Sequence, residues 1–366
     1  MRVIVVGGGL IGTATALALC DAGVDVVLIE RGVLGAEASW AAAGILAPQV
    51  EVEGPGPFLA LSRFGLTSLF AWCARLQERS GVDVGLRRTG TLDVACDDAE
   101  EQALRGRIAW QRSERLSAEW LGVEEVRRQV PGIHGDVRGA AYFADEGSLD
   151  PRRLFEAMSG ALRKAGSQLQ VIARRIERLD ARERKVHLVD APAVVGDVVV
   201  VCAGAWTAAI PGVPVAADAV FPVRGQIAEL CTPPPGTFQS VVFGRGGYLV
   251  PRSDGRVLCG STVERVGFDK AVTAAGLTAV LTRAMSLIPD LGAAAVSSTW
   301  SGLRPGTPDQ KPLLGEASPG VWVASGHYRN GILLAAASAE IVTAGILGRS
   351  LPLDIVPFSP LRFSRA

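Results

Sequence analysis

RVIVVGGGLIG, residues 2–12, is the stretch that predicts the fold. A short β-branched run, Arg2 to Val6, breaks into a glycine cluster in which Gly7, Gly9 and Gly12 fit the pattern G-x-G-x-x-G. In this pattern the first glycine permits a tight turn out of a strand, and the second lets backbone N–H groups approach a pyrophosphate. The third lets the following helix pack closely on the sheet. The stretch therefore predicts a strand, a phosphate-binding turn and the start of a helix.

The residues that follow complete a nucleotide-binding unit. Small and apolar residues recur at helical spacing from Ala14 to Ala22, Gly23 ends the predicted helix, and Asp25 to Ile29 is a second apolar strand that ends at Glu30. The N–H groups at the start of the helix can bind a phosphate, and a carboxylate at Glu30 can accept hydrogen bonds from a ribose. We therefore predict dinucleotide binding. Three clustered glycines would break the helix of a secretory signal, so we expect this segment to be part of the folded protein.

The composition is typical of a globular protein with a large core. Of 366 residues 48% are hydrophobic and 20% charged, and a chain of this length favours two lobes. Lys plus Arg and Asp plus Glu each number 37, and this zero formal charge argues against a nucleic-acid partner or an anionic membrane. We expect no membrane span, because no apolar run is long enough. The six cysteines are scattered without a C-x-x-C pair, which predicts reduced thiols, no metal site and a cytoplasmic protein.

A segment of small residues favours FAD over NAD. Residues 39–44 read SWAAAG at a place where a nicotinamide enzyme would carry another compact strand and helix. Small residues leave room for the isoalloxazine ring and let the backbone form a second wall. Two later glycine turns return to the same site, because Ala203 and Gly204 follow the apolar run 197–202 and Gly331 opens a small-residue helix after the strand 321–325.

The order of the predicted elements indicates an α/β protein with an α+β second lobe. We expect a Rossmann-like FAD-binding domain with an inserted substrate domain built on a mixed or antiparallel sheet. The helical pattern of residues 58–80 belongs to the first, the alternating runs 88–96 and 221–230 to the second, and residues 171–179 with 186–189 read as a small strand pair. The predicted FAD-binding domain comprises residues 1–85, 144–212 and 300–366, and the substrate-binding domain residues 86–143 and 213–299.

Six segments together resemble one family. They are GGGLIG with Glu30, SWAAAG at 39–44, VVVCAGAW at 199–206, YLVPR at 248–252, GLRPGTPDQKPLLG at 302–315 and GHYRNGILLA at 326–335. Over nearly its whole length the chain resembles the D-amino acid oxidase superfamily of FAD-dependent oxidoreductases, and within it most closely the bacterial glycine oxidases of thiamine biosynthesis. Many flavin enzymes share the first two segments, whereas the last two are far more discriminating.

The resemblance implies which residues hold FAD. Sarcosine oxidase relatives attach FAD to a cysteine after a KPxxG element, but here Lys311 to Gly315 is followed by Glu316 with no cysteine nearby, so we expect noncovalent FAD. The implied cofactor residues are Gly7, Gly9, Leu10, Ile11, Gly12, Glu30, Arg31, Ala38, Ser39, Ala43, Gly44, Ile45, Arg175, Ala203, Gly204, His327, Tyr328, Arg329, Asn330, Gly331, Ile332 and Leu333.

The resemblance also implies four residues at the substrate. Arg304 matches the family arginine that holds the substrate carboxylate, and a guanidinium fork suits that role because it pairs bidentately with a carboxylate. Tyr248 matches a tyrosine that lines the substrate pocket, and Arg329 lies next to both flavin and substrate. Ile45 stands where relatives often carry another apolar residue, so it is expected to limit the size of the substrate side chain.

The implied activity is oxidative deamination of glycine, with sarcosine and small D-amino acids as further substrates. A hydride passes from Cα to flavin N5, the imine hydrolyses to glyoxylate and ammonia, and O2 reoxidises the flavin to give H2O2. Implied partners are the small amino acid, O2 and the thiazole synthase machinery of thiamine synthesis, and a homotetramer or homodimer is implied. The alternative is a D-amino acid or sarcosine dehydrogenase with another electron acceptor. An RNA-modifying flavin module is disfavoured by the balanced charge, and a nonenzymatic protein would show no substrate-dependent flavin bleaching.

Overall fold

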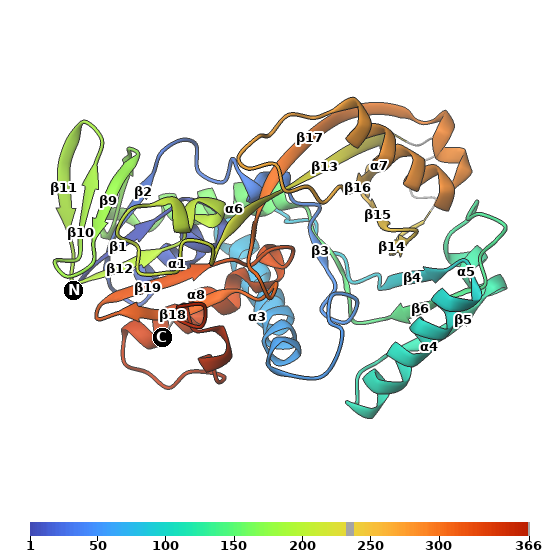
Figure 1. Ribbon diagram of the computed structural model, residues 1–366, viewed down its shortest axis with the longest axis horizontal. Coiled ribbons are helices and arrows are strands. Elements are labelled where there is room, and N and C mark those ends of the chain that lie inside the picture. Colours follow the sequence, from blue (N-terminus) through green and yellow to red (C-terminus); the bar gives the residue numbers. More distant parts are fainter. Residues whose placement is uncertain (232–237, 365–366) are drawn as a thin grey trace.

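Two large β-sheets organise the structure, one in each of two lobes (Figure 1). This computed structural model describes residues 1–231 and 238–364. Both ends of the chain lie in the lobe that carries the glycine turn. The long strands β13 (Phe221–Cys231) and β17 (Ala295–Gly306) run from the junction of the lobes into the second lobe. The α/β class and the Rossmann-like first lobe predicted from the sequence are confirmed.

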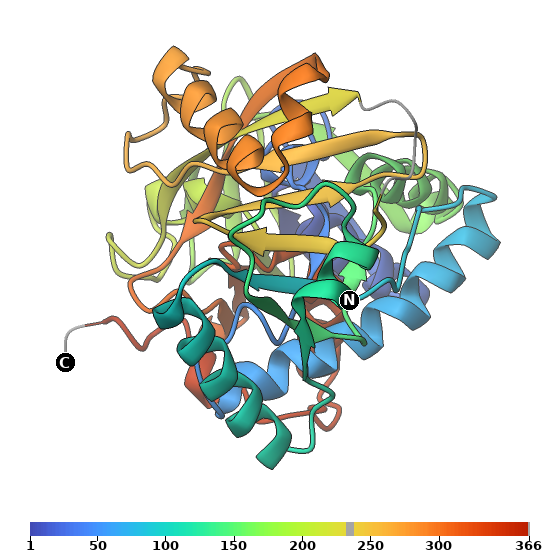
Figure 2. The ribbon, with the colours of Figure 1, turned by 90° about the vertical axis from the view of Figure 1, so that its right-hand side faces the viewer.

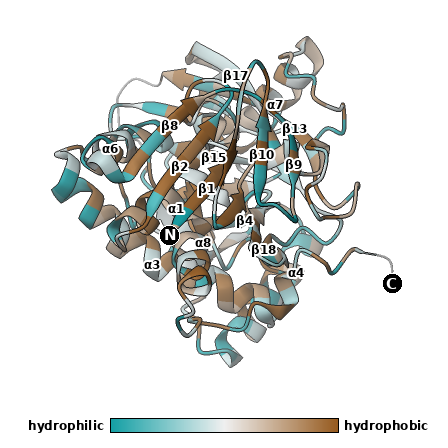
Figure 3. Ribbon diagram, turned by 90° about the vertical axis from the view of Figure 1, so that its left-hand side faces the viewer, coloured by the Kyte–Doolittle hydropathy of each residue, from teal (hydrophilic) through white to brown (hydrophobic). Residues whose placement is uncertain are grey.

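The first sheet has six strands in the order β18-β19-β12-β1-β2-β8. All neighbouring pairs are parallel except β18 and β19. The inner strands are continuous apolar runs because both faces of the sheet are covered, and Figure 3 shows β1 and β2 as hydrophobic over most of their length. The strands are β1 (Arg2–Val6), β2 (Asp25–Glu30), β8 (Leu169–Ala173), β12 (Val198–Val201), β18 (Leu313–Ser318) and β19 (Val321–Ser325).

Helices cover one face of this sheet and a small sheet covers the other. The helical side forms a core with residues of β1, β2 and β12, and the small antiparallel sheet packs Leu179, Val186 and Leu188 on Ile4 and Val6. Asp150 caps the helix that follows it by accepting a hydrogen bond from the Arg152 N–H at 2.9 Å, as predicted. The covering elements are α1 (Leu10–Asp21), α3 (Pro57–Ser80), α6 (Pro151–Arg163), α8 (Gly331–Ile346), β9 (Ile176–Asp180), β10 (Lys185–Leu188) and β11 (Ala191–Val195).

Helix α3 is long and apolar enough to cross a membrane by length and composition, and among the described residues it is the one helix that is. Its apolar side packs on α8 and α6, and Leu61, Leu69 and Cys73 belong to the main core of the first lobe. Its other side carries exposed charges such as Arg75 and Glu78. This one-sided burial is the pattern of a surface helix of a globular domain.

The second sheet has eight strands in the order β17-β13-β16-β15-β14-β4-β6-β5. Its neighbouring strands are antiparallel except β14 and β4, so it is mixed as expected. Helix α7 packs on the β13 to β16 half and α4 on the β4 to β6 half, which Figure 2 views from the side of this lobe. The remaining elements of this lobe are β4 (Thr91–Ala95), β5 (Glu119–Gly122), β6 (Gly139–Phe143), β14 (Val241–Gly244), β15 (Gly247–Pro251), β16 (Arg256–Gly260), α4 (Asp98–Ser113), α5 (Val123–Gln129) and α7 (Ala274–Leu287).

Short elements complete the chain. The strands β3 and β7 pair antiparallel where the chain passes between the lobes, and α2 lies between β2 and β3. Four 3₁₀ helices occur in connecting segments of the described residues. These elements are α2 (Ala38–Ala41), β3 (Ile45–Leu46), β7 (Gly147–Ser148), η1 (Gly166–Gln168), η2 (Gly204–Ala209), η3 (Pro289–Ala293) and η4 (Val356–Phe358).

Two sequence-based assignments differ from the structure. The single strand predicted at residues 171–179 is wrong, because the chain changes sheets at Arg174 and Arg175: β8 pairs with β2 in the first sheet, whereas β9 pairs with β10. The predicted domain boundary between residues 299 and 300 falls inside β17, which pairs with β13 along its length. Pairing of that length favours placing all of β17 in the second lobe, and we propose the other domain boundaries as predicted.

Candidate active site

A cavity of about 670 Å³ lies at the carboxyl ends of β1, β2, β12 and β19. Its opposite wall comes from β13, β15 and β17 of the second lobe, so both sheets contribute to it. In a doubly wound fold the carboxyl ends of the parallel strands are the expected place for a ligand, and this volume suits a cofactor with a small substrate. Every residue predicted to contact cofactor or substrate lines the cavity except Gly12 and Leu333.

Gly12 and Leu333 have packing roles instead. A Cβ at Gly12 would lie 1.9 Å from the Gly7 carbonyl oxygen, so this glycine permits α1 to approach the turn, which is the role that the motif assigns to it. Leu333 points into the apolar core between α8, α1 and α3 and is completely buried. The prediction that these two residues touch the cofactor is not supported by their positions.

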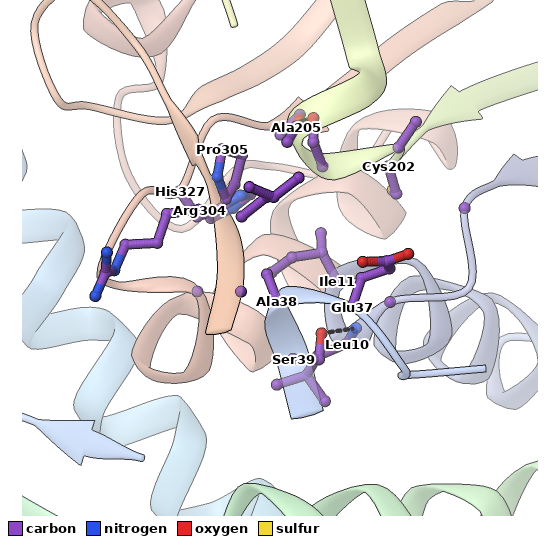
Figure 4. Close-up of a pocket in the computed structure, with 18 of the residues that line it drawn as sticks. Leu10, Ile11, Glu37, Ala38, Ser39, Cys202, Ala205, Arg304, Pro305 and His327 are labelled. Atoms are coloured by element: carbon purple, nitrogen blue, oxygen red, sulfur yellow. Dashed lines mark hydrogen bonds between the residues drawn. The ribbon is translucent and has the colours of Figure 1, made fainter. Parts of the chain in front are cut away.

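The glycine turn forms one end of the cavity. Gly7 has φ +102°, and a Cβ there would lie 2.5 Å from the Cys202 carbonyl oxygen, so a larger residue would be both strained and obstructed. The Leu10 N–H, the first of α1, donates to Ser39 Oγ at 2.8 Å (Figure 4). Ser39 thus joins the small-residue segment to the helix start, and its hydroxyl lines the cavity beside the N–H groups of the turn.

Glu30 ends β2 with both carboxylate oxygens hydrogen-bonded. Oε2 accepts from the Gly8 N–H at 2.7 Å and Oε1 from the Gly32 N–H at 2.9 Å. These bonds orient the carboxylate at the cavity wall, where each oxygen has a further lone pair for a ribose hydroxyl. Next to it, the Arg31 guanidinium lies 3.9 Å from the ring centroid of Trp206, which also lines the cavity.

Arg304 is one of the cations at the other end of the cavity. It lies on β17 opposite Val223 of β13, and its guanidinium donates to Ser261 Oγ at 2.6 Å and to the Thr262 carbonyl at 3.2 Å. A Cβ at Gly225 would lie 2.1 Å from Arg304 Nη1, so the guanidinium rests on a place that only glycine leaves open. Since both acceptors are neutral, the positive charge of Arg304 stays available for an anion.

Tyr248 and Ile45 form the apolar side of this end. Tyr248 on β15 faces Gly260 of β16, where a Cβ would lie 2.4 Å from the tyrosine hydroxyl oxygen. The Tyr248 ring also meets Phe243 edge to face, with 6.0 Å between centroids. Ile45 pairs with Ser148 through β3 and lines the same wall. Gly225 and Gly260 therefore leave the space in which the side chains of Arg304 and Tyr248 lie.

Arg329 forms an ion pair that the sequence analysis did not anticipate. Its Nε lies 2.8 Å from Oε2 of Glu51, and the Glu51 side chain is only 13% exposed. Burial raises the pKa of Glu51, and the guanidinium groups of Arg329 and Arg304 act in the opposite direction. Glu51 also lines the cavity, so this carboxylate belongs to the site.

His327 is the one histidine of the three that lines the cavity. Burial lowers its pKa to about 3, and its Nε2 lies 2.8 Å from Ser338 Oγ. The ring is therefore neutral under physiological conditions and serves as an uncharged hydrogen-bonding group at the start of α8. The positive groups of this end of the cavity are arginines.

Buried Arg252 stabilises the cavity wall through hydrogen bonds to backbone carbonyls. Its Nη2 donates to the Ala43 carbonyl at 2.7 Å and its Nη1 to the Leu149 carbonyl at 3.0 Å, and burial lowers its pKa to about 10. Ala43 and Gly44 line the cavity, and the Leu149 N–H donates to the Gly44 carbonyl. An arginine of the second lobe thus holds the small-residue segment of the first.

The cysteines and the possible metal ligands can be described for the residues that the structure covers. All six cysteines are free, and burial raises the pKa of Cys202, which lines the cavity, to about 12, so that its thiol stays protonated. Within residues 1–231 and 238–364, no group of three His, Cys, Asp or Glu side chains is arranged to hold a metal ion.

Sequence reasoning missed Glu51, Ser261 and Gly225, which shape the substrate end. Glu51 lies in a Pro- and Gly-containing loop without an element pattern, and Ser261 directly follows β16. Gly225 interrupts the alternation of β13, and an isolated glycine inside a strand is a signal of close approach by another group. That signal was present in the sequence, but the group that approaches is known only from the β13–β17 register.

Fold and cavity together define a flavin-dependent oxidoreductase of the two-lobed type. The glycine turn with φ +102° at Gly7, the start of α1 and the oriented Glu30 fit the diphosphate and ribose of FAD, and the small residues Ala43 and Gly44 leave room for its ring system. FAD would be held by these residues and by the turn before α8.

Comparison with known proteins places the chain in its family. The family model described as FAD dependent oxidoreductase, DAO, matches residues 2–344. The chain is 35% identical over 370 residues to the bifunctional protein ThiO/ThiG of Synechocystis, covering 99% of this chain and 54% of that protein. It is 33% identical over 367 residues to the glycine oxidase of Geobacillus kaustophilus, covering 98% of this chain and 96% of that protein.

Solved structures agree with this assignment. The crystal structure of glycine oxidase from Geobacillus kaustophilus matches with a TM-score of 0.94 and 32% identity, and the match covers 100% of both chains. The chain belongs to the D-amino acid oxidase family of FAD-dependent oxidoreductases. It is an FAD-dependent enzyme, as predicted.

Proposed function

We propose that this protein is an amino acid oxidase that deaminates glycine, with sarcosine and small D-amino acids as further substrates. The observation that carries the proposal is Arg304, whose guanidinium faces a cavity continuous with the glycine turn and is hydrogen-bonded only to neutral acceptors among the described residues. The relatives named glycine oxidase support the choice of substrate.

Some residues of the site bind the substrate, and others limit its size. Arg304 binds the substrate carboxylate bidentately and so orients the amine and Cα relative to the cofactor end of the cavity. Tyr248 and Ile45 close the apolar side and favour a substrate with little or no side chain. FAD, when bound, supplies the two-electron acceptor for oxidation of the amine. The products are glyoxylate and ammonia after hydrolysis of the imine, and H2O2 when O2 takes the electrons.

The biological setting is part of the proposal. The Synechocystis relative is named ThiO/ThiG, and this supports a link between glycine oxidation and the thiazole synthase machinery of thiamine synthesis. A cytoplasmic location and a homo-oligomeric state, tetramer or dimer, stay predictions. Light scattering of the purified protein measures the second.

One experiment tests the activity. The purified holoenzyme is titrated without oxygen with glycine, sarcosine, D-alanine and D-proline while its visible spectrum is recorded, and air is then admitted. If glycine bleaches the flavin and admitted air then reoxidises it with release of H2O2, the result supports the oxidase. A flavin that no amino acid bleaches contradicts the substrate claim. Bleaching without reoxidation in air identifies a dehydrogenase with another electron acceptor.

A further inference from the structure

Two arginines line the substrate end of the cavity, but they differ in how their charge is balanced. Arg304 donates to a hydroxyl and a carbonyl, and within the described chain it has no carboxylate partner at ion-pair distance. Arg329 has one, because Glu51 Oε2 lies 2.8 Å from its Nε. Of these two arginines at the substrate end, Arg304 is therefore uncompensated and Arg329 is paired.

Glu51 is built into the site and is not a surface partner. Its side chain is 13% exposed while that of Arg329 is 43% exposed, so the pair lies where the cavity wall meets solvent, with the carboxylate on the inner side. Glu51 lies within electrostatic range of Arg304 as well as Arg329. Removal of its charge would leave two cations facing one cavity, a condition that favours a ligand with two anionic groups.

We propose that Glu51 sets the charge of the accepted substrate: by pairing with Arg329 it leaves Arg304 as the one unpaired cation that the described residues place at the substrate end, so the site takes amino acids with one carboxylate and rejects those with a second anionic group. This inference rests on the proposed function for the identity of the substrate, but the charge selection itself is a property of the cavity. Specificity here comes from the repulsion between the Glu51 carboxylate and a second anionic group of the ligand, and not from a contact that glycine makes.

The nearby Glu53 provides a matched control. It lies two positions further in the same loop, carries the same charge and is exposed, and it does not line the cavity. Glu53→Gln changes the net charge of the protein by the same amount as Glu51→Gln. A difference between the two variants therefore reports the location of the charge and not the overall field of the protein.

The test uses two anions that cannot be oxidised, acetate and malonate. Their dissociation constants are measured in mildly alkaline buffer at fixed ionic strength, from the change in flavin absorbance of the holoenzyme, for the parent, Glu51→Gln, Glu51→Asp, Glu53→Gln and the double variant Glu51→Gln with Arg329→Gln. We expect Glu51→Gln to bind malonate roughly tenfold more tightly relative to acetate, because Arg329 gains a second anionic group as its partner. Glu51→Asp and Glu53→Gln should keep the parent ratio, and the double variant should lose the gain.

The proposal is overturned if the malonate to acetate ratio of Glu51→Gln equals that of the parent, or if Glu53→Gln changes it as much. It is also overturned if the double variant keeps the gain, since Arg329 would then not be the second cation. Anion binding needs no turnover, so a protein that binds acetate but does not oxidise glycine would refute the proposed function and leave this test intact. Oxidation of iminodiacetate by Glu51→Gln, compared with glycine, then extends the result to a substrate.

Discussion

The two ends of the cavity are built by different means. At the cofactor end the chain presents backbone: a glycine turn, the start of α1 and the oriented carboxylate of Glu30. At the substrate end it presents charged side chains, Arg304, Arg329 and Glu51, set on strands and loops far apart in the sequence. The first end depends on space that side chains would fill, and the second depends on side chains held at fixed places. We therefore expect substitutions at the cofactor end to lower stability and FAD content, and substitutions at the substrate end to lower activity.

The largest effect is expected at the cofactor end, for Gly12→Ala. The new Cβ would lie 1.9 Å from the Gly7 carbonyl oxygen, and backbone cannot move aside as a flexible side chain can. We expect a loss of about 3 kcal/mol or more in unfolding free energy together with loss of FAD. Thermal unfolding and the ratio of flavin to protein absorbance measure both. Gly54→Ala, whose Cβ would meet nothing within 4 Å, should leave both unchanged.

At the substrate end, Arg304→Met should greatly lower activity and spare the fold. The variant removes the cation that holds the carboxylate, and a lost charged pair of this kind lowers kcat/KM for glycine by about a thousandfold. FAD content and thermal unfolding should stay close to the parent because the side chain is partly exposed and lies on β17 of the second sheet, whereas the glycine turn follows β1 of the first. Loss of FAD in this variant would show that the two ends are not separable.

Gly225→Ala fills space at the substrate end, as Gly12→Ala does at the cofactor end. The Cβ would lie 2.1 Å from Arg304 Nη1 and would displace the guanidinium without removing it. We expect kcat/KM for glycine to fall by about ten- to a hundredfold with FAD retained, since misplacement of a binding group costs less than its loss. Gly106→Ala in α4, which meets nothing within 4 Å, is the control. Activity unchanged in Gly225→Ala would mean that Arg304 adapts freely.

The smallest expected effect lies at the junction of the lobes. Glu146 is completely buried, its Oε1 accepts hydrogen bonds from the N–H groups of Gln49 and Val50, and burial raises its pKa from 4.5 to about 8. The folded state thus holds the proton more tightly than the unfolded state, so stability is full below about pH 4.5 and is lost as the pH rises to about 8.

In Glu146→Gln this part of the pH dependence should vanish. The amide keeps an oxygen acceptor for the two N–H groups and has no proton to lose. Melting temperatures measured across this pH window should fall less in the variant than in the parent. Equal slopes of melting temperature against pH for the two proteins would show that Glu146 does not lose a proton in this pH window.

Local signals explain why the cofactor end could be predicted from the sequence. Strand, glycine turn, helix, strand and acid follow one another within residues 2–30, and each has its own residue pattern, so β1, α1 and β2 have the bounds that the pattern indicates. The N-cap at Asp150 was predictable for the same reason, since a cap depends on its immediate neighbours.

The substrate end needed the fold. The register that puts Val223 opposite Arg304 and Gly225 beneath its guanidinium joins two strands that β14, β15, β16 and α7 separate in the sequence. The pair of Glu51 and Arg329 likewise links distant segments, and neither has a local pattern that names its partner. Arg304 itself was predicted through family resemblance. The split of residues 171–179 into β8 and β9 was missed because both halves have strand composition, and only the change of sheet separates them.

The strand order of the first sheet also fixes when the cofactor can be loaded during synthesis. β1 lies between β2, made at once, and β12, which exists only after residues 198–201 have been translated. β19 and the start of α8 come later still, beyond residue 320. Until β12 has been made, a nascent chain therefore carries the glycine turn with one edge of β1 unpaired, a condition that invites chaperone binding or aggregation. The FAD site is therefore complete only after residue 332 has been translated, because the turn before α8 and the first residues of that helix line the cavity.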